Sequence, residues 1–145
     1  MLTVSSIALS PQVLDELALA AYAAVISDNL NKTQVNRLIE VLESTRNVDY
    51  LLAHIARQVG RAKESRDRNV PWKKSHYSAS KLFQLLKNRS YGEAKVILGI
   101  FKWLFEAGIG RRRQLDLLRR QLKINLGGKA PRDFYYKYLD TVLSP

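Results

Sequence analysis

The sequence predicts an all-α protein, a single-domain compact helical bundle of about six helices. Apolar residues recur at helical spacing along most of the chain, whereas the alternating runs typical of strands are few. The chain has 145 residues, 46% of them hydrophobic, which suits one domain with a sizeable core. It has no cysteine, so neither disulfides nor thiolate-bound metal can hold the fold. We therefore expect residues 1–145 to form one helical domain held together by packing.

Capping signals and apolar stripes place the first three helices. Ser10, followed by a proline, indicates the start of a helix over about residues 11–27. Asn31, with Gln34 three residues on, indicates a capping box at the start of a second helix. A third helix is expected over about residues 48–63, where apolar residues share one side and two arginines another.

The middle of the chain is expected to hold an exposed connection and two helices. Residues 65–77 mix basic and aromatic side chains around a proline, which is typical of a connection. A short helix is expected over about residues 78–87. Ser90 and Glu93 then form a capping box for a helix that is apolar almost all round. This pattern predicts a central, buried helix that ends at Gly108.

Two more helices are expected near the end of the chain. A basic helix over about residues 111–125 has leucines at helical spacing and stops before Gly127 and Gly128. Pro131 then permits a last helix over about residues 132–143, which has aromatic and aliphatic side chains to pack.

The chain is strongly basic. It has 24 Lys and Arg residues against 13 Asp and Glu residues, a net charge of +11 and a sequence pI near 10.1. Residues 1–56 hold 3 basic and 6 acidic groups, so the basic excess begins at Arg57. An excess of this size opposes compaction unless a polyanion offsets it. It therefore favours a nucleic acid as the partner.

Few residues could carry out chemistry. The chain has two histidines and no cysteine, and its carboxylates are scattered, so no combination of acid, base and nucleophile is evident. His54 is expected at a helix surface or core edge, and His76 either has an ordinary loop role or touches a phosphate. Neither a Gly-rich phosphate loop nor a metal-ligand motif is present. We therefore expect no enzymatic activity, metal or cofactor, with an enzyme of unrecognised site as the third class considered.

No stretch suits a membrane. The longest nearly apolar run, Leu17–Ile26, is far shorter than the roughly 20 residues that span a bilayer. The first residues also lack the pattern of a secretory signal. We therefore expect a cytoplasmic protein. The run Leu17–Ile26 packs either in the core or, in part, against another subunit.

Two basic clusters and one tryptophan are the candidate nucleic-acid-binding residues. Arg and Lys displace counterions from phosphates, which gives binding that is independent of base sequence and weakened by salt. Trp72 either stacks on an unpaired base or closes over the core. The first cluster consists of Arg57, Arg61, Arg66, Arg68, Lys73 and Lys74. The second cluster consists of Arg112, Arg113, Arg119, Arg120 and Lys123.

Two segments resemble the small helical subunit of type III CRISPR effector complexes. Residues 32–37, Lys-Thr-Gln-Val-Asn-Arg, are similar to that family's Thr-x-Gln-aliphatic-x-Arg/Lys helix start. Residues 51–61, Leu-Leu-Ala-His-Ile-Ala-Arg-Gln-Val-Gly-Arg, are similar to its Ala-rich helix that ends in basic residues. The resemblance covers about residues 28–107. The basic helix from Arg111 and the aromatic residues 134–136 do not map onto it.

This resemblance implies a non-catalytic RNA-binding subunit of an antiviral defence complex. Several copies would lie along a ribonucleoprotein and hold guide and target RNA by their backbones, while other subunits cut. Arg57 and Arg61 would face the RNA, whether single-stranded or a guide–target duplex, and Arg37 is a further candidate. The other subunits would be partners, and self-association is compatible with this arrangement.

The alternative is a DNA-binding protein of helix-turn-helix type. Its basic helix from Arg111 would enter a major groove. That helix has only Gln114 as an amide side chain near its start, so base readout looks poor. The sequence leaves open the copy number, the strand contacted, the CRISPR subtype and any base preference.

Overall fold

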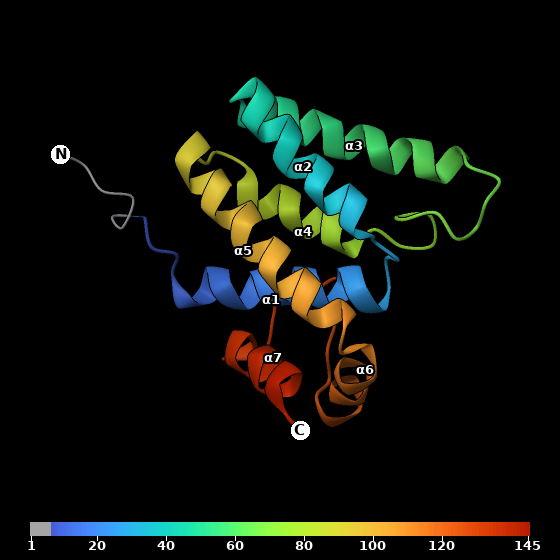
Figure 1. Cartoon of the computed structure of the whole chain (residues 1–145), viewed down its shortest axis with the longest axis vertical. Coiled ribbons are helices and arrows are strands. Elements are labelled where there is room, and N and C mark those ends of the chain that lie inside the picture. Colours follow the sequence, from blue (N-terminus) through green and yellow to red (C-terminus); the bar gives the residue numbers. More distant parts are fainter. Residues whose placement is uncertain (1–6) are drawn as a thin grey trace.

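Within residues 7–145, seven α-helices follow the expected ranges, one more than the approximate count. The computed structural model describes residues 7–145, and no strand occurs within them. Figure 1 shows α2 and α3 at one end of the long axis, α6 and α7 at the other, and α1 between them. The helices are α1 (Pro11–Ile26), α2 (Lys32–Thr45), α3 (Val48–Glu64), α4 (Tyr77–Leu86), α5 (Tyr91–Ile109), α6 (Arg112–Gln121) and α7 (Phe134–Leu143).

Helix α1 forms the centre of the core. Every residue from Leu17 to Val25 is buried, because α4, α5, α6 and α7 all pack against this helix. The apolar run Leu17–Ile26 therefore packs inside its own chain, and the alternative of a subunit contact is wrong for its buried part. Helix α5 is less enclosed than its sequence indicates, since Trp103 on this helix is 72% exposed.

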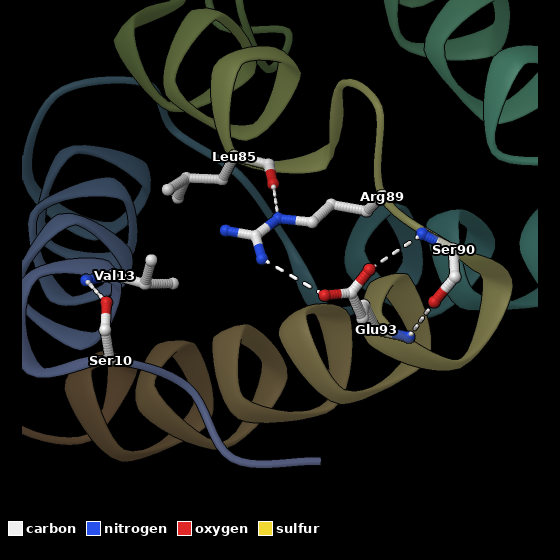
Figure 2. Close-up of polar contacts among 6 residues, drawn as sticks. All are labelled: Ser10, Val13, Leu85, Arg89, Ser90 and Glu93. Atoms are coloured by element: carbon white, nitrogen blue, oxygen red, sulfur yellow. Dashed lines mark hydrogen bonds and ion pairs between the residues drawn. The ribbon is translucent and has the colours of Figure 1, made fainter.

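Side-chain caps fix where several helices begin. The Ser10 hydroxyl accepts a hydrogen bond from the Val13 amide at 3.2 Å. Ser90 and Glu93 form the predicted capping box, with bonds of 3.0 and 3.1 Å in both directions (Figure 2). Figure 2 also shows Arg89 reaching from the α4–α5 connection to the Glu93 carboxylate.

The capping box expected at α2 is only half formed. The Asn31 side chain accepts a hydrogen bond from the Gln34 amide at 2.8 Å, as predicted. The Gln34 side chain does not return the bond, and its Oε1 atom is buried without a hydrogen-bond partner. The start of the helix is confirmed, whereas the reciprocal bond is wrong.

Two predicted helix ends differ from the structure. Helix α5 runs on to Ile109, and Gly108 is a buried residue within it rather than its stop. Helix α6 ends at Gln121, about one turn before the expected residue 125, because Leu122 is extended. Lys123 consequently follows the helix instead of lying on it.

No helix within residues 7–145 combines the length and apolar character that crossing a membrane requires.

Candidate nucleic-acid interface

Helices α2 and α3 carry three predicted interface arginines, two of which lie near one histidine. Arg57 and Arg61 are exposed one turn apart on α3, and Arg37 is exposed on α2. His54 lies on α3 one turn before Gln58 and is partly buried. Burial lowers the pKa of His54, and the positive charges of Arg37 and Arg57 lower it further. Arg37 and Arg57 therefore both lie close enough to His54 to lower its pKa, although 20 positions separate them in the sequence.

The connection between α3 and α4 carries the rest of the first cluster. Arg66, Arg68 and Lys74 are exposed, and Lys73 is half-buried. The Lys73 ammonium donates a hydrogen bond of 2.6 Å to the Lys63 carbonyl, which ties the connection to the end of α3. The side chain of Lys63, which the sequence analysis did not single out, donates one of 2.9 Å to the Lys73 carbonyl. Basic side chains thus continue from α3 into the connection.

Trp72 is a buried core residue and does not present an open face on which a base could stack. Its side chain is 1% exposed, and its indole Nε1 donates a hydrogen bond of 2.8 Å to the Ser78 hydroxyl. Its backbone lies in the left-handed region at φ 66°, which is uncommon for a bulky residue. A hydrogen bond of 2.9 Å from its amide to the Asp28 carbonyl holds that conformation. Stacking of a base on an exposed face of Trp72 is therefore excluded in this structure.

The anchor of the connection is Asp28, which the sequence analysis did not identify. This residue follows α1 and is 1% exposed. Its carboxylate accepts hydrogen bonds of 2.6 Å from the Ser75 hydroxyl and from both the amide and the hydroxyl of Ser78. Its charge lies at the N-terminus of α4, where the helix dipole favours an anion. No local pattern marks this role, because the partners are nearly 50 residues away.

The second cluster is exposed on α6 and just beyond it. Arg112, Arg113, Arg119 and Arg120 are exposed on the helix, whereas Leu115 and Leu118 are buried, and the exposed Lys123 follows it. This placement confirms that the leucines pack and that the arginines face solvent.

The two clusters approach one another at the start of α6. Arg112, Asn69 and Pro71 line one cavity of about 370 Å³, so the connection and α6 share a border. Figure 1 shows the α3–α4 connection and α6 on the same side of the molecule, to the right. The connection of the first cluster and the helix of the second cluster therefore lie on one side of the molecule.

Most of these basic residues form no ion pair within residues 7–145. Four ion pairs occur within the described residues, and only the pair of Arg37 with Glu40, at 3.7 Å, involves a predicted interface residue. The other pairs use Lys81, Arg89 and Lys95. No Arg or Lys of the two clusters therefore forms an ion pair within residues 7–145.

Two cavities adjoin the first cluster. One, of about 200 Å³, lies between α2 and α3 and is bordered by Trp72. The other, of about 380 Å³, lies beside Lys63 and Lys74 and includes His76. Gln34, which lines the first, and His76, which lines the second, each have one buried side-chain atom without a hydrogen-bond partner, Oε1 and Nδ1 respectively.

The arrangement can bind anions. Within residues 7–145, no group of three or more His, Asp or Glu side chains is placed to hold a metal ion. The fold and these clusters define an all-α protein with a basic, largely unpaired surface. No protein-family model matches the sequence, and no curated protein matches it significantly. We therefore infer the function from the residues themselves.

Proposed function

We propose that this chain is a non-catalytic, RNA-binding small subunit of a cytoplasmic CRISPR ribonucleoprotein effector complex. It holds guide or target RNA through contacts to the RNA backbone. The observation that carries the proposal is that the arginines of both clusters are exposed and, within residues 7–145, unpaired.

Unpaired cations of this kind suit a phosphate backbone. Each Arg or Lys that contacts a phosphate releases condensed counterions, which favours binding at low salt whatever the base sequence. Arginine also matches a phosphate with two parallel hydrogen bonds. The prevalence of Arg over Lys in both clusters therefore agrees with a phosphate-binding surface.

The position of the two family-like segments supports the RNA-binding part of the proposal. Residues 32–37 form the first turns of α2, residues 51–61 lie within α3, and the two helices pack together. Their basic residues Arg37 and Arg57 act on the same histidine. The two segments thus contribute to a single surface, as they must if both bind the same RNA.

Exposed aromatic side chains support a place within an assembly. Trp103 on α5 is 72% exposed and Tyr136 on α7 is 64% exposed. Aromatic residues are enriched where proteins contact one another. These two are candidates for contacts with neighbouring subunits.

Binding to several labelled nucleic acids, followed by fluorescence anisotropy, tests the proposal. We expect two unrelated single-stranded RNAs to bind with similar affinity, and salt to weaken both. Strong preference for one duplex DNA sequence would instead support the helix-turn-helix alternative, with α6 as the reading helix. Co-purification from the native host, with identification of the bound nucleic acid and partner proteins, tests the membership of a complex.

A further inference from the structure

The cavity beside Lys63 and Lys74 has an accessible aromatic side chain in its wall. Its volume is about 380 Å³, within the range of roughly 300–1,000 Å³ that is usual for ligand sites. Tyr77, the first residue of α4, lines this cavity and is 40% exposed. A β-carbon on Gly127 would lie 3.5 Å from the Tyr77 ring, so the segment after α6 packs beside that ring. Unlike the buried Trp72, Tyr77 can therefore be contacted by a ligand.

Two polar side chains accompany Tyr77 on the same face of α4. Tyr77, Ser80 and Gln84 are spaced i, i+3 and i+7, which places them on one side of a helix, and all three line the cavity. Ser80 and Gln84 are both exposed. Their hydroxyl and amide groups can donate and accept hydrogen bonds at the edge of a ring that lies against Tyr77.

Two cations border the same cavity. Lys63 and Lys74 are exposed, and neither forms an ion pair within residues 7–145. The Lys63 ammonium uses one of its three N–H groups for the bond of 2.9 Å to the Lys73 carbonyl and keeps two for a ligand. The lining also includes Lys81, whose charge is offset by Glu16 at 2.6 Å, but no Asp or Glu. A phosphate at this cavity would therefore meet positive charge only.

A nucleotide of a single strand has the groups that this cavity can contact, which are a flat base, a polar base edge and a phosphate. We propose that one unpaired RNA base enters the cavity and stacks on the ring of Tyr77. The edge of the base faces Ser80 and Gln84. The flanking phosphates contact Lys63 and Lys74.

This inference rests on the proposed RNA binding and deepens it. In a duplex, neighbouring bases already cover both faces of each base, so stacking on Tyr77 requires an unpaired strand. The inference therefore assigns single-stranded RNA, rather than a guide–target duplex, to the surface beside Lys74. Stacking accepts any base, because every base has a π-face, so binding stays independent of the base sequence.

Two variants of Tyr77 test the stacking contact, since Tyr77→Leu removes the aromatic ring and Tyr77→Phe keeps it. Fluorescence anisotropy measures binding to an oligouridine of about 12 nucleotides and to an abasic ribose-phosphate oligomer of the same length. We expect Tyr77→Leu to bind oligouridine about 5- to 150-fold more weakly than the parent, and Tyr77→Phe to bind it as the parent does. Neither variant should change the affinity for the abasic oligomer or the slope against salt, because no phosphate contact is lost.

The matched control is Tyr50→Leu. Tyr50 is 61% exposed near the start of α3, roughly 20 Å along this helix from Lys63, and it does not line the cavity. Its replacement should leave the affinity for oligouridine unchanged. A duplex RNA provides a second control, because the parent and Tyr77→Leu should bind it equally.

The possible results separate the two proposals. Equal binding of oligouridine and the abasic oligomer by the parent, or oligouridine affinity that Tyr77→Leu leaves unchanged, would overturn the stacking site. Losses of similar size in Tyr77→Phe or Tyr50→Leu, or an equal loss for the abasic oligomer in Tyr77→Leu, would overturn it as well. In each of these cases, salt-dependent binding by the parent would leave the backbone-binding function standing. An absence of RNA binding at every salt concentration would overturn both.

Discussion

The hydroxyl group of Tyr138 on α7 occupies the space that a side chain on Gly108 of α5 would need. Tyr138 is fully buried and donates a hydrogen bond of 2.6 Å to the Leu104 carbonyl, one turn earlier on α5. A β-carbon at position 108 would also approach Leu115 and Val25, at 3.0 and 3.1 Å. The junction of α1, α5, α6 and α7 therefore requires glycine at this position.

We expect Gly108→Ala to lower the free energy of unfolding by roughly 1–3 kcal/mol, the range for overpacking a core. The control is Gly99→Ala on the same helix, where nothing lies within 4 Å of an added β-carbon. That change should raise the free energy of unfolding by roughly 0.5–1 kcal/mol, because alanine favours a helix more than glycine does. Urea unfolding followed by circular dichroism measures both. Similar effects of the two changes would contradict the packing described around Gly108.

Asp28 leads to a second prediction, about the connection that carries part of the first cluster. Asp28→Asn places an amide N–H group against hydroxyl and amide donors of Ser75 and Ser78. We expect a loss of roughly 1–3 kcal/mol in the free energy of unfolding. Because Arg66 and Arg68 lie in the loosened connection, trypsin should also cleave there faster than in the parent protein.

The control for this prediction is Asp140→Asn, since Asp140 is exposed on α7. It should change neither stability nor the cleavage rate by a comparable amount. Unchanged stability and cleavage in Asp28→Asn would show that Asp28 does not anchor the connection.

The lowered pKa of His54 predicts a dependence of stability on pH. Burial is the main cause, and Arg37 and Arg57 add to it, so the folded state binds a proton less readily than the unfolded state does. Stability is therefore greatest above the ordinary pKa of 6.5 and falls as the pH drops from there toward the lowered value.

His54→Gln removes this loss. We expect the variant to lose less stability than the parent between about pH 7.5 and about pH 5.5, measured by urea unfolding at each pH. At about pH 7.5 and above, the two proteins should show parallel profiles, which is the internal control. A parent and a variant that lose stability equally on acidification would contradict the assigned direction of the pKa shift.

Local signals explain why most helices could be predicted. The bonds of Ser10 and of the Ser90–Glu93 pair join residues three positions apart, so the sequence alone contains both partners. Tertiary contacts explain the errors. Gly108 has the local character of a helix stop, and only the position of Tyr138 shows that its lack of a side chain serves packing.

In the candidate site, too, local features could be predicted from the sequence and tertiary contacts could not. The exposed arginines of both clusters could be predicted, because charge density and helical spacing are properties of neighbouring residues. The burial of Trp72 and the anchor at Asp28 could not, since the bond between the Trp72 amide and the Asp28 carbonyl joins segments 44 positions apart. The place of Gln34 in the lining of a cavity was also missed, because its position three residues after Asn31 indicates a cap.

Salt dependence of RNA binding tests the central claim most directly. The variants are Arg57→Ala, Arg61→Ala and Arg119→Ala, and the control is Lys87→Ala. Lys87 is exposed in the α4–α5 connection, which Figure 1 shows on the opposite side from the α3–α4 connection.

The affinity of each protein for two unrelated single-stranded RNAs and one duplex DNA is measured over a series of salt concentrations. We expect each arginine variant to bind both RNAs more weakly, by about the same factor, and to reduce the slope of log K against log salt by roughly 0.7. Lys87→Ala should leave this slope unchanged. Arginine variants whose slopes match the parent protein, or a strong preference for the duplex, would contradict binding to the RNA backbone.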